Sequence, residues 1–244
     1  MRCCGAMIAV VGSMAPLVTA AELTAYEIMQ KFRAAEAARD GALKKYSVTR
    51  RYAVENEKRT RTAETTAKID FRADRGKSYE ILAEGGSDGL FRRAIHRVLD
   101  SEVDASKSRG REEIRLTPEN YGFQLDGMQT ADGRECYVVE LHPRHKSKYL
   151  IDGRVWIDRA EFAIVRLEGR PAASLSFWIG RPMIIQTFQK VGDFWLLSTT
   201  QSIADCRFIG RTILYIEASD FDVPGAPRVT IAKSPGQPFG PAVD

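Results

Sequence analysis

The sequence predicts a mainly β protein with a few α-helices, in which a strongly curved antiparallel sheet, or unclosed β-barrel, has helices covering its concave side. Most of the 244 residues fall into runs where apolar and polar residues alternate, which is typical of strands with one buried face. Short turns join these runs, as they do between antiparallel neighbours. About ten such strands cannot form a flat open sheet, so the sheet must curl, close or stack.

The N-terminus has the pattern of a cleavable signal peptide. Arg2 gives a basic start, residues 6–18 form an apolar run, and Val18, Thr19 and Ala20 offer small residues to a signal peptidase. An uncleaved anchor would need about 20 apolar residues. We therefore expect a signal peptide at 1–20, one half-barrel domain at 21–223 and a loosely ordered tail rich in Pro and Gly at 224–244. The expected compartment is the periplasm.

An amphipathic helix is expected over residues 22–39, because apolar side chains recur there at helical spacing. Thr24 with Glu27 three positions later fits a capping box. Asp40 and Gly41 are expected to end the helix. Its apolar stripe has to pack against another element, and the sheet that follows is the expected surface.

Three strands are expected next, over residues 46–54, 62–71 and 77–83. Arg50 interrupts the apolar face of the first of them. Gly85 and Gly86 are expected to break the sheet, after which Ser87 or Asp88 can cap a helix. This second helix is expected to reach about residue 99 and to cover one end or one face of the sheet.

Strands resume from residue 120 and continue almost to the tail. We expect them over 120–128, in three runs within 133–169, and over 177–188, 194–204 and 208–218. Asp152 followed by Gly153 is a dipeptide typical of hairpin turns. Pro182 cannot donate to a ladder, so it marks an edge, a bulge or a bend.

The sequence contains no convincing catalytic or metal-binding pattern. His142 and His145 lack a fixed common face and companion ligands, and no nucleophile-elbow motif occurs. Charges of both signs are interspersed at a net +4, which excludes a block of basic residues for nucleic acid. We therefore expect no enzymatic activity, catalytic residue, cofactor, metal or nucleic-acid partner. Cys136 and Cys206 remain after signal cleavage, and they form either one disulfide or two buried free thiols.

Several short stretches resemble the LolA/LolB-like superfamily of outer-membrane lipoprotein-sorting proteins. GRVWID at 153–158, followed by FAIVRLEG at 162–169, resembles the central hairpin of that family, and DGRECYVV at 132–139 resembles the strand before it. FWLL at 194–197 resembles a later strand, with Leu197 where a proline is common. The resemblance implies an unclosed barrel with a lid of helices, no cofactor and a hydrophobic cavity that receives lipoprotein acyl chains. The arginine that these carriers use near the lid would correspond to Arg72 or Arg75.

We therefore expect a periplasmic, chaperone-like carrier that binds lipid or lipoprotein acyl chains and serves outer-membrane biogenesis. The helix over residues 90–99 would be its lid, and an inner- or outer-membrane protein its partner. The alternative is a non-catalytic envelope interaction module with a filled core. In the carrier, bulky residues would line the cavity, namely Tyr52, Ile69, Tyr79, Phe91, Ile95, Trp156 and Trp178.

Overall fold

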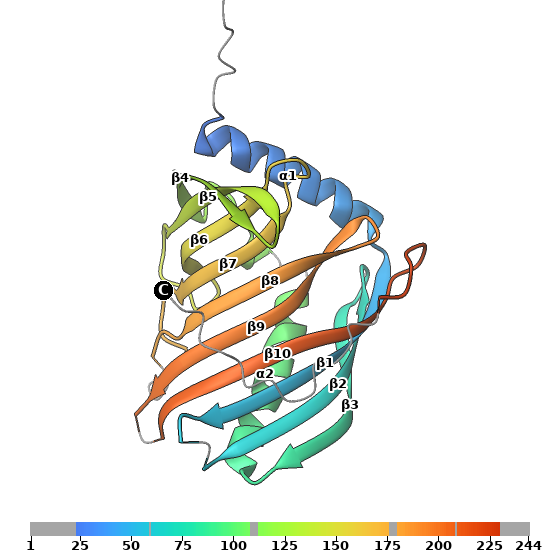
Figure 1. The fold of residues 1–244 in the computed structure, drawn as a ribbon, viewed down its shortest axis with the longest axis vertical. Helices are drawn as coiled ribbons and strands as arrows, with labels where there is room; N and C mark the ends of the chain where they lie inside the picture. The colour runs from blue at the N-terminus through green and yellow to red at the C-terminus, as the bar shows by residue number, and fades with distance from the viewer. Residues whose placement is uncertain (1–22, 59, 108–111, 176–179, 208, 230–244) are drawn as a thin grey trace, which may run out of the picture.

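The computed structural model describes residues 23–58, 60–107, 112–175, 180–207 and 209–229 (Figure 1). Its two long helices are α1 (Ala25–Ala42) and α2 (Gly89–Ser106). The strands are β1 (Lys45–Asn56), β2 (Thr62–Arg72), β3 (Gly76–Gly86), β4 (Tyr121–Ala131), β5 (Arg134–Pro143), β6 (Ile151–Asp158), β7 (Ile164–Pro171), β8 (Met183–Val191), β9 (Phe194–Cys206) and β10 (Gly210–Asp222).

All these strands belong to one antiparallel sheet with the order β3-β2-β1-β10-β9-β8-β7-β6-β5-β4. The order is linear, so among the described strands β3 and β4 form two edges and the sheet does not close into a barrel. The first three strands make one meander and the last seven make another, and β10 joins the two by pairing with β1. The predicted fold class, an unclosed and mainly β architecture with few helices, is confirmed.

One row of residues runs across the whole sheet, each member directly opposite the next. From β4 to β3 the row is Leu125, Val139, Val155, Leu167, Gln186, Thr200, Ile216, Tyr52, Thr65 and Glu84. Directly opposed side chains point to the same side of a sheet. We call the side that this row defines the inner face.

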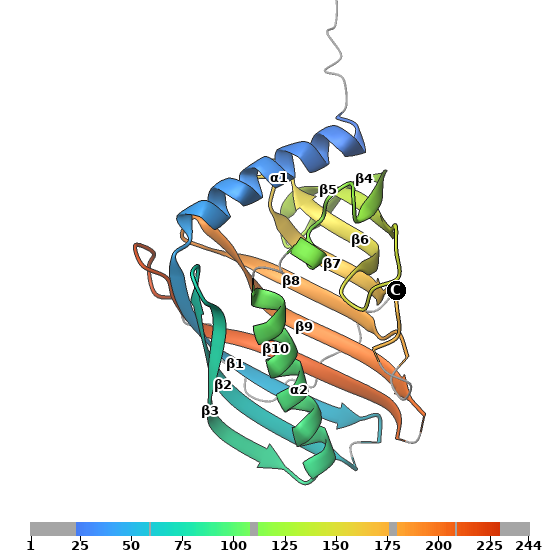
Figure 2. The same ribbon diagram turned by 180° about the vertical axis from the view of Figure 1, so that it is seen from behind.

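Two separate hydrophobic clusters cover the two ends of the inner face. The α2 cluster packs Phe91, Ile95 and Leu99 of α2 against residues of β1, β2 and β10. The α1 cluster packs Ile28, Met29 and Phe32 of α1 against residues of β5, β6 and β7. Seen from behind, α2 lies against β1–β3 while α1 crosses the end of the sheet near β4–β7 (Figure 2).

The helix α1 begins as the sequence predicts. The Thr24 hydroxyl accepts a hydrogen bond from the Glu27 amide at 3.3 Å, and the Glu27 carboxylate accepts one from the Thr24 amide at 2.8 Å. The predicted stop at Asp40 is too early, since the helix runs to Ala42. Arg39 stabilises its last turns by donating to the carbonyl oxygens of Glu161 and Phe162, at 3.0 and 2.8 Å.

The helix α2 also begins at its predicted cap. The Asp88 carboxylate accepts hydrogen bonds from the amides of Leu90 and Phe91, at 2.8 and 3.2 Å. The helix extends past the predicted end near residue 99 to Ser106. The strand before it also runs further than predicted, because Gly85 and Gly86 still pair with β2.

One predicted turn is wrong. Asp152 and Gly153 lie inside β6, while the chain between β5 and β6 turns at residues 144–150. Gly153 is opposite Gly169, and a Cβ at Gly153 would lie 2.1 Å from the carbonyl oxygen of Glu168. The glycine is therefore required by the close approach of β7. Pro182 lies immediately before β8, and the expected strand over 177–188 begins only at Met183, with residues 176–179 outside the described ranges.

Candidate functional site

The structure brings five of the seven predicted lining residues together. Tyr52, Ile69, Phe91 and Ile95 are buried in the α2 cluster, and Tyr79 packs against it. Tyr52 and Ile95 are both 0% exposed, so α2 fills the space beside them.

The other two predicted lining residues are not part of this group. Trp156 pairs with Val138 and Arg166, which alternate with the inner-face residues of their strands. It packs with Cys136, Val138 and Val165 in a third cluster on the opposite, outer face. Trp178 lies outside the described residues.

A buried ionic network joins α2 to the sheet. Arg50 of β1 is only 2% exposed, and its Nη1 donates to Oε2 of Glu102 on α2. The Tyr52 hydroxyl donates to Oε1 of the same carboxylate at 3.2 Å, and Lys77 Nζ donates to Oε2 at 3.3 Å. Arg50 Nε is buried and has no hydrogen-bond partner among the described residues. The network holds α2 in place, but it leaves one buried donor unsatisfied.

The charges in this network depend on each other. Burial alone would raise the pKa of Glu102, but the positive charges of Arg50 and Lys77 outweigh burial and lower it. Burial and the neighbouring Glu102 raise the pKa of Tyr52, so its hydroxyl keeps its proton and acts as a donor. Glu102 is therefore an anion that three donors from the sheet share.

Sequence reasoning pointed to different arginines near the covering helix. Arg72 and Arg75 are exposed at the β2–β3 turn, where both approach Asp74, at 3.8 and 3.3 Å. The arginine that contacts α2 is Arg50, which the sequence marked only as an interruption in an apolar face. The sequence could have indicated this contact in one way, through a cation at a position where apolar residues are expected. A buried charge needs a partner, so such a cation implies an anion nearby.

Two further hydrogen bonds attach α2 to the edge strand β3. His96 Nε2 lies 2.6 Å from Oε1 of Glu84, and the Tyr79 hydroxyl donates to Asp100 at 2.8 Å. Both pairs are largely exposed, and exposed polar pairs contribute little to stability. The helix is thus attached by a short apolar stripe and by polar contacts.

Between the two clusters the inner face carries a strip of half-covered side chains that we call the inner band. Its members are Ile184, Gln186 and Phe188 of β8, Thr200 and Ser202 of β9, and Leu214 of β10. All except Thr200 are half-buried. Phe188 packs against the α1 cluster and Leu214 against the α2 cluster. The band therefore joins the two clusters by a surface with apolar residues at both ends.

A small cavity of 110 Å³ opens where the inner band meets α1. Phe32 and Leu43 line it from the helix side, and Ile164, Phe188 and Phe194 line it from the sheet. Glu36 also faces it, and burial together with nearby Asp40 raises the pKa of that carboxyl. The cavity is mostly aromatic and aliphatic, as binding sites for apolar groups are.

Cys136 and Cys206 are both free thiols in the structure, and Cys136 is buried whereas Cys206 is half-buried. Cys136 lies on β5 and Cys206 on β9, four strands further along the sheet. At the usual spacing between neighbouring strands, four strands correspond to about 19 Å across the sheet. A disulfide needs the two Cα atoms to lie within about 7 Å of each other. Burial raises the pKa of Cys136 to about 11, so its thiol stays protonated and unreactive.

The described residues hold no group of three or more His, Cys, Asp or Glu side chains that could bind a metal ion. Within the same ranges, neither helix is long and apolar enough to span a membrane. The predicted signal peptide and residues 230–244 of the predicted tail lie outside the described residues.

No protein-family model and no curated protein matches the chain significantly. Several solved structures of similar fold are outer-membrane lipoprotein-sorting or LolA superfamily proteins. A putative outer membrane lipoprotein-sorting protein domain from Vibrio parahaemolyticus is 14% identical, with a TM-score of 0.43 over 82% of this chain and 92% of that chain. A LolA superfamily protein from Nitrosomonas europaea is 12% identical, with a TM-score of 0.36 over 84% and 96%.

A third similar structure is the MucA/MucB complex of Pseudomonas aeruginosa. It is 11% identical, with a TM-score of 0.25 over 80% of this chain and 93% of that chain. At identities this low, the similarity is one of fold alone. A fold does not determine what a protein binds.

Proposed function

We propose that this protein is a periplasmic carrier that binds lipid or lipoprotein acyl chains along the inner band, with α2 as a displaceable cover. The signal-peptide pattern supports the periplasmic location. The observation that carries the proposal is the half-exposure of Ile184, Phe188 and Leu214 on a face whose two ends are fully buried. A hydrocarbon chain laid on these residues would gain about 0.8 kcal/mol for each buried CH₂ group.

The attachment of α2 supports its role as a cover. Only three of its large apolar side chains are buried, and the Arg50–Glu102 pair holds it by charge. Desolvation offsets much of the attraction in a buried ion pair. A chain that buries several CH₂ groups can therefore compete with the apolar stripe of α2 for the α2 cluster. Four residues would then contact the chain and line the open form, namely Tyr52, Ile69, Phe91 and Ile95.

The test compares two aspartate substitutions on one strand. Ile184→Asp places a charge on the inner band, whereas Ile185→Asp places it on the outer face of β8. We expect the affinity for a fluorescent long-chain fatty acid to fall at least about tenfold for Ile184→Asp, since burying an unpaired charge costs more than 1.4 kcal/mol. Ile185→Asp should bind as the unchanged protein does. Equal affinities for the two variants, or no binding by the unchanged protein, would contradict the proposal.

The complete packing of the α2 cluster favours a second candidate, an envelope interaction module with a filled core. This module would carry no lipid. Native mass spectrometry of protein purified from the periplasm separates the two candidates, because the carrier should retain bound lipid and the module should show only the mass of the chain.

A further inference from the structure

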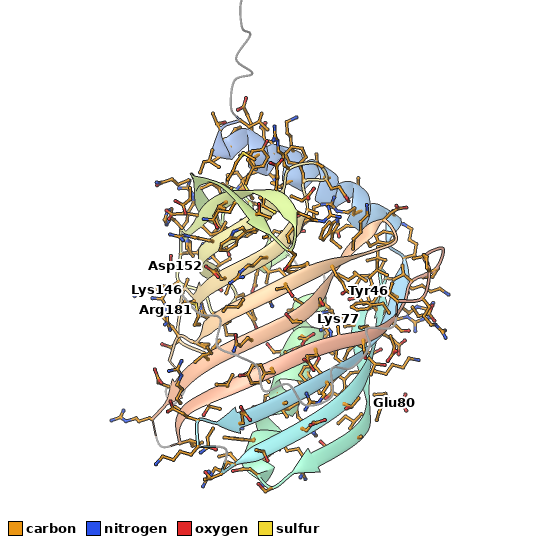
Figure 3. The ribbon with its side chains drawn as sticks, in the orientation of Figure 1. Tyr46, Lys77, Glu80, Lys146, Asp152 and Arg181 are labelled. Atoms are coloured by element: carbon orange, nitrogen blue, oxygen red, sulfur yellow. The ribbon has the colours of Figure 1, made fainter. Side chains whose placement is uncertain are left out.

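A larger cleft, of 720 Å³, lies at the end of the sheet where β1 begins, β2 ends and β3 begins. Five basic residues line it, namely Lys45, Lys68, Arg72, Arg75 and Lys77. We call this site the cationic cleft. It is distinct from the inner band, which lies on β8, β9 and the opposite half of β10. Figure 3 labels Tyr46 and Lys77 at this end of the sheet.

Carboxylates are too few to neutralise the cationic cleft. Among the described residues, its lining includes two carboxylates, Asp70 and Asp222. Asp70 lies 3.8 Å from Lys68, while Asp222 is already paired with Arg228 outside the cleft lining, at 3.3 Å.

The remaining cations share their partners or have none. Arg72 and Arg75 share the exposed Asp74, and Lys77 shares Glu102 with Arg50. Lys45 has no ion pair with any described carboxylate. The pairs of Arg72 and Arg75 are exposed and weak, whereas Lys77 belongs to the buried Glu102 network. The other cations therefore give the cleft an excess of positive charge that an anion could use.

A stacked aromatic pair supports the cleft from the inner face of the sheet. The rings of Tyr46 and Phe71 stack with their centroids 5.1 Å apart, and both residues line the cleft. Both are half-buried, and Tyr46 packs against the α2 cluster. The strand ends that form the cleft are therefore anchored in the core, whereas Lys45, Lys68 and Arg72 alternate with this aromatic pair and lie on the outer face.

The β2–β3 turn is fixed against the end of α2, which keeps the cleft in shape. The Lys77 amide donates to the Ser106 hydroxyl at 2.7 Å, and that hydroxyl donates to the Val103 carbonyl at 2.6 Å. Gly76 has φ +81°, and a Cβ there would lie 2.6 Å from Ser106 Oγ. A glycine is thus needed for this contact, which positions the backbone beside Arg75 and Lys77.

We propose that the cationic cleft binds the phosphate group of a phosphate ester. Arginine guanidinium groups bind phosphate oxygens in a bidentate manner, and lysine adds a point charge. The same chemistry could come from a soluble phosphate ester or from the headgroup of an anionic phospholipid. The site goes beyond the proposed function, because it requires no acyl chain on the inner band.

The experiment compares two double charge reversals in the full chain. Lys45→Glu with Arg72→Glu changes the cleft. Lys58→Glu with Arg211→Glu makes the same charge change near the opposite ends of β1 and β10, at exposed residues outside the cleft. One arm titrates glycerol phosphate by calorimetry. The other measures flotation with phosphatidylcholine vesicles, with and without phosphatidylglycerol.

We expect the unchanged protein to bind in at least one arm, and the cleft variant to lose at least about tenfold in affinity there. The control variant should change less than about threefold, since charges beyond a Debye length are screened. A loss with glycerol phosphate assigns the site to soluble esters, and a loss only with phosphatidylglycerol vesicles assigns it to headgroups. No binding in either arm, or equal losses in the two variants, would overturn the proposal whatever the inner band binds.

Discussion

At the scale of single residues, Arg50 is the side chain whose role differs most from its appearance in the sequence. It occupies an inner-face position between Val48 and Tyr52, where an apolar residue would be expected, and it is 2% exposed. Its charge is tolerated because Glu102 reaches it from α2. Replacing both partners of such a pair by apolar residues can be neutral, but removing one leaves a buried charge unpaired. Arg50 therefore makes the position of α2 specific.

Glu102 makes a testable prediction about pH. Its folded-state pKa is lowered, so its contribution to stability is fully present above the ordinary value of 4.5 and is lost as the pH falls through the folded pKa. We expect Glu102→Gln to reduce the free energy of unfolding at neutral pH by about 3 kcal/mol, because Arg50 then lacks its anion. The difference between the variant and the unchanged protein should shrink steadily below pH 4.5 in urea unfolding. A constant difference across that range would show that Glu102 is not the titrating group.

At the scale of elements, the pairing of β6 with β7 depends on two opposed glycines. Gly153 and Gly169 face each other, and a Cβ at either would lie less than 3 Å from backbone atoms of the neighbouring strand. The backbones can approach closely because neither residue has a side chain. This contact explains a dipeptide that is otherwise typical of a turn.

The prediction for this pair uses a glycine on another strand as its control. Gly153→Ala should lower the free energy of unfolding by about 1–3 kcal/mol, because the strands must separate to admit the methyl group. Gly122→Ala on β4 meets only ordinary contacts, the nearest at 3.7 Å, and should change it by less than about 0.5 kcal/mol. Denaturant titration of both variants checks this, and similar effects at the two positions would contradict the steric explanation.

At the scale of the whole molecule, the two helices are attached in different ways. Arg39 of α1 is hydrogen-bonded to backbone carbonyls of the β6–β7 turn. The contacts of α2 lie on β1, β2 and β3 and are mostly side chain to side chain, apart from Ser106 and from Arg92, which donates to the Gly86 carbonyl. An acyl chain that extends from the inner band toward the α2 cluster should therefore displace α2 and leave α1 in place.

Hydrogen exchange can measure that difference. With a saturating long-chain fatty acid, we expect amide exchange in residues 89–106 to become faster, while exchange in residues 25–42 stays unchanged. The Ile184→Asp variant, which should not bind the chain, serves as the control and should show no change in either helix. Slower exchange in α2 of the unchanged protein would mean that the helix closes over the ligand instead of yielding to it.

Much of the fold follows from local patterns. Alternation along each strand determines which side chains share a face, and Thr24, Glu27 and Asp88 fix where the helices start through contacts within three residues. These features need only neighbouring residues, so they could be predicted. The proposed site was only partly predictable, because Tyr52, Ile69 and Ile95 do share one cluster whereas Trp156 lies on the outer face.

The sequence by itself determined that the strands form an unclosed antiparallel sheet, since apolar and polar alternation depends only on neighbouring residues. Only the tertiary structure decided that Arg50 meets Glu102 across 52 positions, that Cys136 and Cys206 stay apart, and that α2 fills the space beside Tyr52. The physical reason is that partners distant along the chain are chosen by the order and register of the strands, which no local pattern specifies.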